Sequence, residues 1–177
     1  MTESRAVDDR RQELHAELDR VRRTFAQHVA EMTPADLARP SNGTRWTNRE
    51  LLFHMLFGYL VVQALLPMVK GLGHLPPGSS RPFAALLDAS TRPFDWINYV
   101  GSVGGGRVLT PQRMVRWLDS VTARIERDMD RQSPARLRRG MHFPTHWDPY
   151  FKDFMTLADT YHYPTEHFDH HDRQLSV

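Results

Sequence analysis

The chain has 177 residues, of which 40% are hydrophobic and 25% charged, and its formal net charge at pH 7 is +2. This size suits one ordinary globular domain with its own core, so we expect a single domain over residues 1–177. The chain has no cysteine, which excludes a disulfide framework, a thiolate metal site and a cysteine nucleophile.

Two further features bear on where the protein works and with what. The first twenty residues are rich in charge and contain no apolar stretch suited to a signal peptide, so we expect a cytoplasmic protein. The opposite charges nearly balance, although Arg136, Arg138 and Arg139 form a local basic cluster. Because no recognition helix or stacking platform accompanies this cluster, we expect no nucleic-acid partner.

The first predicted helix ends before Thr33-Pro34. Its apolar residues alternate at spacings of three and four, with charged residues between them, as in an amphipathic helix. These apolar residues are Leu14, Leu18, Val21, Phe25, Val29 and Met32.

The second predicted helix begins at Thr47, which forms a capping box with Glu50. Residues 51–68 are apolar almost all round, which fits either a buried central helix or a membrane span. His54 and Gln63 interrupt the run and would need polar partners in lipid. We therefore expect a core helix and no membrane.

The region between the second and third helices contains two Pro/Gly-rich stretches, residues 71–82 and 101–106, which we expect to be irregular. Residues 83–100 carry several aromatic and aliphatic side chains. They are predicted to be helical in part, with a break near Arg92-Pro93.

Two more helices follow. Thr110-Pro111 is a good N-cap and first-turn pair for a third helix, and Thr156 with Asp159 begins a fourth that runs to about Leu175 and bends at Pro164. No strand pattern is convincing. The expected fold is therefore all-α, a four-helix bundle with an extra helical segment between the second and third helices.

Histidines concentrate near the C-terminus. Residues three or four apart share a helix face, so His167 can pair with either His170 or His171. Successive side chains around a helix are turned by about 100°. On this basis Phe168, Leu175 and Pro164 point to one side of the helix, which we take as the buried side. His171 points to the same side, and His170 points to its edge. The helical geometry therefore favours His167 and His171 as the pair.

A catalytic metal site of the zinc type takes three protein ligands and keeps one position open. His54 is the candidate third ligand because it stands in an apolar helix, where an unpartnered imidazole is costly, and Gly58 would leave space beside it. Taken alone, His54 is better explained as a core histidine that forms a hydrogen bond to a carbonyl or a hydroxyl. Taken alone, His167 and His171 fit the polar end of a helix. Together the three histidines favour a metal site, and Gln174 could bond a ligand histidine or a metal-bound water.

Other polar residues give weaker signals. Pro144 breaks the helical spacing between His142 and His146, which we expect in a loop or at a pocket rim, while His15, His28 and His74 fit surface or packing positions. No carboxylate is assigned as a general base. Asp148, Asp159 and Glu166 fit caps and solvated surface equally well.

Two passages carry a family resemblance: residues 46–54, WTNRELLFH, and residues 167–175, HFDHHDRQL. They resemble the DinB/YfiT-like family, in which a tryptophan and a helix cap precede a histidine on helix two and HxxxHxxQ ends helix four. The resemblance implies an up-down-down-up bundle, often dimeric, that binds a divalent metal through His54, His167 and His171. Family members include thiol S-transferases and mycothiol-dependent isomerases; some of the latter carry glutamate where this chain has His167.

The expected function is a divalent-metal-dependent enzyme, a thiol S-transferase or a related activity on a small electrophilic substrate. The metal would be zinc, nickel or iron, and a low-molecular-weight thiol would be the cosubstrate. Phe57, Gly58 and Val61 are expected to line the pocket, with Phe94 to Tyr99 as a lid. The alternatives are a catalytically silent binding protein and a metallohydrolase. A homodimer is expected from the resemblance and from so apolar a second helix.

Overall fold

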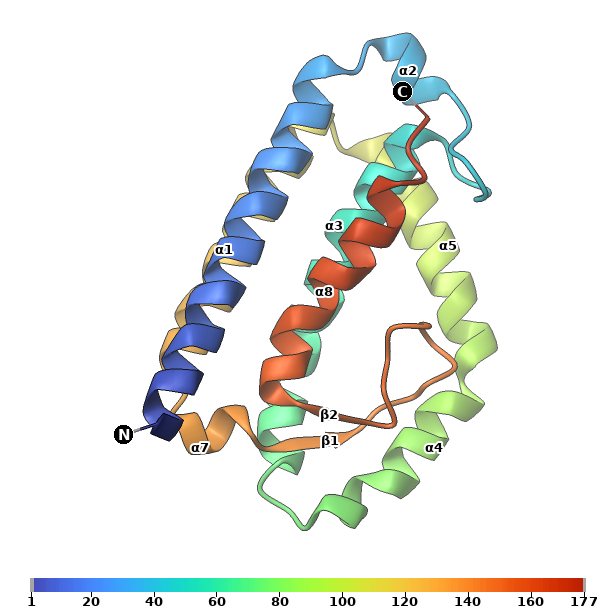
Figure 1. The fold of residues 1–177 in the computed structure, drawn as a ribbon. Helices are drawn as coiled ribbons and strands as arrows, with labels where there is room; N and C mark the ends of the chain where they lie inside the picture. Colours follow the sequence, from blue (N-terminus) through green and yellow to red (C-terminus); the bar gives the residue numbers. More distant parts are fainter. Residues whose placement is uncertain (1, 177) are drawn as a thin grey trace.

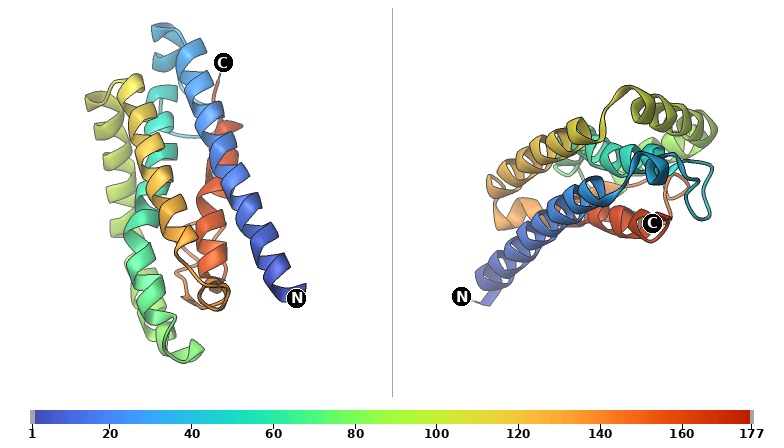
Figure 2. Two further views of the ribbon diagram at one scale, coloured as in Figure 1. Left: turned by 90° about the vertical axis from the view of Figure 1, so that its left-hand side faces the viewer. Right: turned by 90° about the horizontal axis from the view of Figure 1, so that it is seen from above.

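The computed structural model describes residues 2–176, so Met1 and Val177, the ends of the expected domain, lie outside the described residues. Four long helices form the bundle: α1 (Thr2–Glu31), α3 (Asn48–Leu72), α6 (Pro111–Asp130) and α8 (Leu157–Asp172). α1 and α8 run in one direction and α3 and α6 in the other (Figures 1 and 2). α1 and α3 each pack against both α6 and α8. The all-α prediction is confirmed, with the helices in up-down-down-up order.

The helix starts follow the capping signals. Thr47 with Glu50 and Thr156 with Asp159 both form complete capping boxes, and Thr110 accepts a hydrogen bond from the amide of Arg113. Thr33 ends the first helical region and caps the short α2 (Pro34–Ala38). α8 contains Pro164 but ends at Asp172, not near Leu175. The amides of Gln174 and Leu175 donate to carbonyls three residues earlier, as in a 3₁₀ turn, so the α-helical hydrogen-bond pattern does not continue to Leu175.

The core lies where the apolar spacing predicts it. All six apolar residues expected on the inner face of the first helix, from Leu14 to Met32, are buried, although Met32 lies just past the end of α1. α3 packs against α5, α6 and α8, and its residues 51–56 are all buried, whereas Ala64, Pro67 and Gly71 in its second half are exposed. By length and composition α3 could cross a membrane, but more than half of its most apolar window is buried in the protein. It is the central helix of the core.

The segment between α3 and α6 forms a short 3₁₀ turn (Pro77–Ser80), α4 (Arg81–Ala89) and α5 (Thr91–Val108). The break comes at Ser90, and residues 101–106, which we expected to be irregular, are helical. Glycine lowers helix propensity by about 1 kcal/mol per residue. Here it allows close helix packing: a Cβ on Gly105 would overlap the ring of Phe53, and one on Gly106 would lie 2.8 Å from Cα of Glu50.

The structure also contains two short strands, β1 (Gly140–His142) after α7 (Pro134–Leu137), and β2 (Phe154–Thr156). They pair antiparallel, with Met141 opposite Met155. The expectation of no strands is wrong here, because three residues are too few to show an alternating pattern. The strands hold the ends of the loop 143–153, which lies beside α8 and reaches toward α5 (Figure 1).

Candidate metal centre

The bundle brings three histidines together from two helices. His54 comes from α3, and His167 and His171 come from α8; one ring nitrogen of each lies within 4.8 Å of the others. Nε2 of His54 is 3.0 Å from Nε2 of His171. The residues are only 3%, 6% and 9% exposed. His170 lies outside this group, with its Nδ1 3.0 Å from the hydroxyl of Tyr150.

In each of the three rings, Nδ1 points away from the cluster and forms a hydrogen bond to a neighbouring side chain. Nδ1 of His167 donates to Asp148 Oδ2 at 2.8 Å, and Nδ1 of His171 donates to Gln174 Oε1 at 2.6 Å. Nδ1 of His54 lies 3.2 Å from Ser102 Oγ. The Ser102 hydroxyl donates to the carbonyl of Asn98, so its oxygen accepts from His54. With all three Nδ1 atoms protonated, each neutral ring presents an unprotonated Nε2.

The converging Nε2 atoms could hold a cation between them. Nε2 of His167 is buried without a hydrogen-bond partner. With the protons of His54 and His171 on their Nδ1 atoms, no proton lies between the Nε2 atoms of these two rings, which are 3.0 Å apart. Two nitrogens bound to one tetrahedral zinc stand about 3.3 Å apart, close to the observed spacing. Outer hydrogen bonds of this kind orient metal-ligating histidines. The three residues therefore fit a divalent metal ion.

The surroundings of His54 and His171 disfavour the protonated forms of these two rings. Burial, together with the neighbouring His167 and His171, lowers the pKa of His54 well below its ordinary value. Burial, followed by the nearby His167, lowers the pKa of His171 to about 3. Metal ligands must be unprotonated, so a depressed pKa favours binding near neutral pH.

Neighbouring residues fix where the rings lie. Trp46 stacks on the ring of His54 with centroids 4.3 Å apart. Gly58, expected to leave space beside His54, instead makes room for His167: a Cβ there would lie 2.9 Å from Cδ2 of that ring. Gln174, expected to support a ligand, bonds His171.

Asp148, which from the sequence fitted a cap or solvated surface equally well, is a site residue. Besides His167, its carboxylate accepts hydrogen bonds from the hydroxyl of Tyr163, at 2.9 Å, and from the amide of Tyr150, at 2.8 Å. Burial opposes ionisation, but the hydrogen bond from His167, together with those from the amide of Tyr150 and the hydroxyl of Tyr163, outweighs it, and the pKa of Asp148 is lowered. The only sequence signal is a local turn, because the carboxylate bonds the amide two residues on. Nothing local connects Asp148 with a histidine nineteen residues away.

A pocket opens beside the cluster, with His54 and His167 in its wall and about 330 Å³ of empty space including its mouth. Phe94 of α5 and Trp147 of the 143–153 loop stack at 4.0 Å and form one side. Of the expected lid, Phe94 and Asn98 line the pocket, whereas Tyr99 stacks on Trp46. The other lining residues are Phe57, Gly58, Val61, Asp148, Phe151 and Tyr163.

The remaining histidines lie away from the cluster. His142 is in β1 and not in a loop, but it lines a pocket, as the alternative expectation had it, and lies beside Asp153 and Arg81. His146 is largely exposed and pairs with Asp88. His15 and His28 contact Asp130 and Asp172, and His74 accepts a bond from Arg139. Asp159 is a helix cap, and Glu166 pairs with His162 across one turn of α8.

Comparison with known proteins gives one match. Searches of the curated proteins and of the solved structures found no significant match. The family model described as DinB superfamily matches residues 17–175, which include every residue of the histidine cluster and of the pocket beside it. Since this match covers nearly the whole chain, the protein belongs to the DinB superfamily.

Proposed function

We propose that this protein is a divalent-metal-dependent enzyme that transfers a low-molecular-weight thiol to a small, largely apolar electrophile. One observation carries the proposal: three unprotonated Nε2 atoms converge at the wall of an apolar pocket, to which both His54 and His167 belong. The metal would sit where a substrate can reach it. A low-molecular-weight thiol has to be supplied as a cosubstrate, since the chain has no cysteine.

The residues around the cluster suit this chemistry. A divalent cation bound there would lower the pKa of a coordinated thiol and so favour the nucleophilic thiolate. Phe57, Phe94 and Trp147 offer an aromatic surface for the apolar body of the electrophile and exclude water from it. Asn98 also lines this pocket, beside His54, and its side-chain oxygen can accept a hydrogen bond from the substrate.

A metallohydrolase is the weaker candidate because no carboxylate in the pocket is free to activate water. Asp148 is the carboxylate in its wall, and its oxygens already accept bonds from His167, Tyr163 and the amide of Tyr150. A carboxylate so engaged positions a histidine and cannot easily take a further proton. This favours transfer over hydrolysis.

The metal is proposed to be zinc, nickel or iron, which three imidazoles all accommodate, so cellular supply decides among them. We further propose a cytoplasmic homodimer whose partner in the reaction is a small molecule.

The first test is metal content. Elemental analysis should find close to one divalent metal per chain, and His54→Ala, His167→Ala and His171→Ala should each lower it sharply. His170→Ala is the matched control, because His170 is on the same helix but bonds Tyr150 instead. Full occupancy in His54→Ala would overturn the ligand set.

The second test separates an enzyme from a catalytically silent binding protein. Metal-loaded and metal-free protein are compared for consumption of a thiol in the presence of a generic electrophile. Metal-dependent turnover, with a cobalt spectrum that changes on thiol addition, supports transfer. A protein that binds its metal fully but neither responds to thiols nor turns them over contradicts the enzymatic proposal and leaves the metal site intact.

A further inference from the structure

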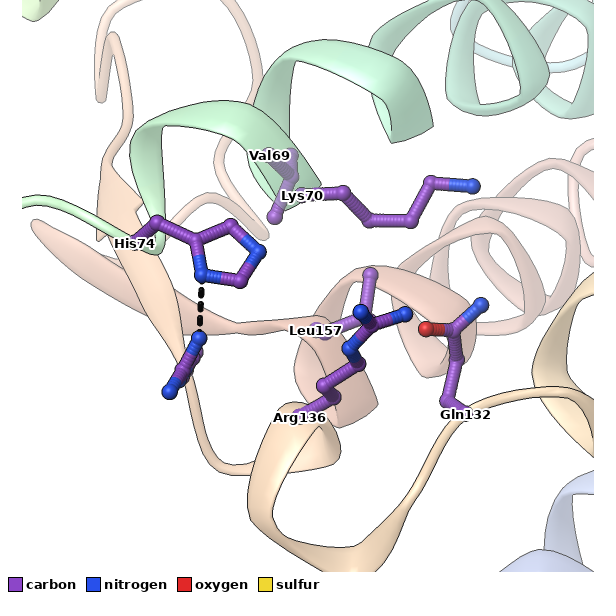
Figure 3. A pocket seen from close by; sticks show the side chains of 7 residues that line it. Val69, Lys70, His74, Gln132, Arg136 and Leu157 are labelled. Atoms are coloured by element: carbon purple, nitrogen blue, oxygen red, sulfur yellow. Dashed lines mark hydrogen bonds between the residues drawn. The ribbon is translucent and has the colours of Figure 1, made fainter.

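A second pocket lies at the far end of the bundle from the histidine cluster. It is formed by the end of α3, with Val69 and Lys70, the segment around α7, and Leu157, the first residue of α8 (Figure 3). It has about 340 Å³ of empty space. Lys70 is sixteen residues after His54, about 24 Å along the helix axis. The two pockets share no lining residue.

The wall of this second pocket has an excess of positive charge. Lys70, Arg136 and Arg139 line it together with His74. Lys70 pairs with Asp128 at 2.7 Å. Among the residues whose side chains the structure describes, no carboxylate forms an ion pair with Arg136 or Arg139. Among the described side chains, the two guanidinium groups that line the pocket therefore have no carboxylate partner.

His74 adds a further donor. The guanidinium of Arg139 donates to Nδ1 of His74, because guanidinium has no acceptor. The neutral ring then carries its hydrogen on Nε2. The donors of the pocket come from two separate segments of the chain, residues 70–74 and residues 136–139, so they can approach an anion from different sides.

Gln132 supplies an independent sign of a ligand. Its side chain is only 6% exposed, and its Oε1 is buried without a hydrogen-bond partner, while its amide nitrogen donates to the carbonyl of Asp128 at 2.8 Å. Figure 3 shows the amide of Gln132 and the guanidinium of Arg136 turned toward the same space. An unpaired buried acceptor calls for a donor such as the hydroxyl of a hydrogen phosphate or a phosphate ester.

We propose that this pocket binds a phosphate group, either as inorganic phosphate or as a small phosphate monoester. A tetrahedral oxyanion offers several oxygens to donors that converge from different directions, and its protonated oxygen matches Gln132. Val69 and Leu157 give the pocket an apolar surface that an organic group on the ester can cover. The site is separate from the metal centre and does not depend on the function proposed for it.

Calorimetric titration of the metal-loaded protein with inorganic phosphate, phenyl phosphate and benzoate tests this proposal. Phosphate or its ester should bind, more weakly as salt is added, and benzoate, which carries the same ring on a planar carboxylate, should bind at least about tenfold more weakly. If the ester binds more tightly than phosphate, an organic group occupies the apolar surface; equal affinity assigns the site to free phosphate. Absence of binding by both, or benzoate binding equally well, overturns the proposal.

Substitutions in the pocket test whether the measured phosphate binding takes place there. Arg136→Gln/Arg139→Gln should weaken phosphate binding at least about tenfold, whereas Arg113→Gln, an exposed arginine on α6 that lines neither pocket, should leave it unchanged. Gln132→Leu should keep the melting temperature of the free protein and reduce the increase that phosphate causes. Equal binding by the double variant and Arg113→Gln contradicts the assignment.

Discussion

At the scale of single residues, the candidate metal centre depends on the side chain that forms a hydrogen bond to Nδ1 of each imidazole. Asp148 fixes the proton of His167 on Nδ1 and leaves Nε2 free. Carboxylate partners of this kind change metal affinity by about 10- to 100-fold when they are altered. We therefore expect Asp148→Asn to weaken zinc binding within that range, measured by competition with a chelator.

Asp153→Asn is the matched control, because Asp153 lies in the same stretch of chain and contacts a different histidine, His142, at 3.1 Å. Its zinc affinity should equal that of the unaltered protein. An equal loss in the two variants would mean that the loop as a whole, and not the bond to His167, determines affinity.

The depressed pKa of His171 predicts how metal-free protein responds to acid. In the folded state this pKa is about 3, against an ordinary value of 6.5. Below about pH 6.5 the unfolded chain takes up the proton and the folded protein does not, so the free energy of unfolding falls as the pH falls toward 3. Urea denaturation between pH 7.5 and 4.5 should show a smaller fall in His171→Gln.

His146→Gln serves as the comparison for that experiment, since the side chain of His146 is 74% exposed. The acid sensitivity of this variant should match that of the unaltered protein. Identical pH dependence in His171→Gln and the unaltered protein would contradict the assignment of a strongly lowered pKa to His171.

Helical geometry indicated the His167 and His171 pair, since a ring's direction on a helix follows from its place in the turn. The structure brings that pair to His54. It places Asp148 there too, through a loop whose path is set by the strand pairing and by the stacking of Trp147 on Phe94. Such long-range contacts leave no local pattern in a sequence.

At the scale of elements, predictions succeeded where the signal was local and failed where packing decided. Capping boxes at Thr47 and Thr156 gave the starts of α3 and α8 because each box involves only four consecutive residues. The glycines of α5 predicted an irregular stretch because they weaken a helix in isolation. In the folded protein these glycines matter for tertiary packing, because the absence of a Cβ at Gly105 and Gly106 lets α5 lie directly on α3.

Two neighbouring glycines test this explanation. Gly105→Ala should destabilise the protein by about 1–3 kcal/mol, because its Cβ would overlap the ring of Phe53. Gly104→Ala should stabilise it by up to about 1 kcal/mol, because nothing lies within 4 Å of the added Cβ and alanine favours the helix. Chemical denaturation measures both. Similar effects in the two variants would show that close packing on Phe53 does not explain Gly105.

At the scale of the whole molecule, the exposed apolar surface lies on α5 and α4, whereas the sequence suggested the second helix. The second helix was expected to exceed what one bundle can cover, but α5, α6 and α8 cover most of the apolar side chains of α3. α5 lies outside the four-helix core, on the side away from α1 (Figures 1 and 2). Its residues Trp96, Ile97 and Val100 are 66%, 55% and 42% exposed, and Leu86 of the adjoining α4 is 67% exposed. A patch of this composition is typical of a surface that another chain covers.

We expect this patch to form the interface of a homodimer. Stable interfaces of this kind bury about 1,200–2,000 Å² in total, and a two-fold axis would pair the α5 helix of one copy with that of the other. Light scattering at micromolar concentration should give twice the chain mass, and Ile97→Glu should halve it by placing a charge in the centre of the patch. Ala30→Glu makes a similar change on the exposed face of α1, across the bundle, and should leave the dimer intact. A monomeric unaltered protein would rule out this interface, and a dimer that survives Ile97→Glu would place the contact on another face.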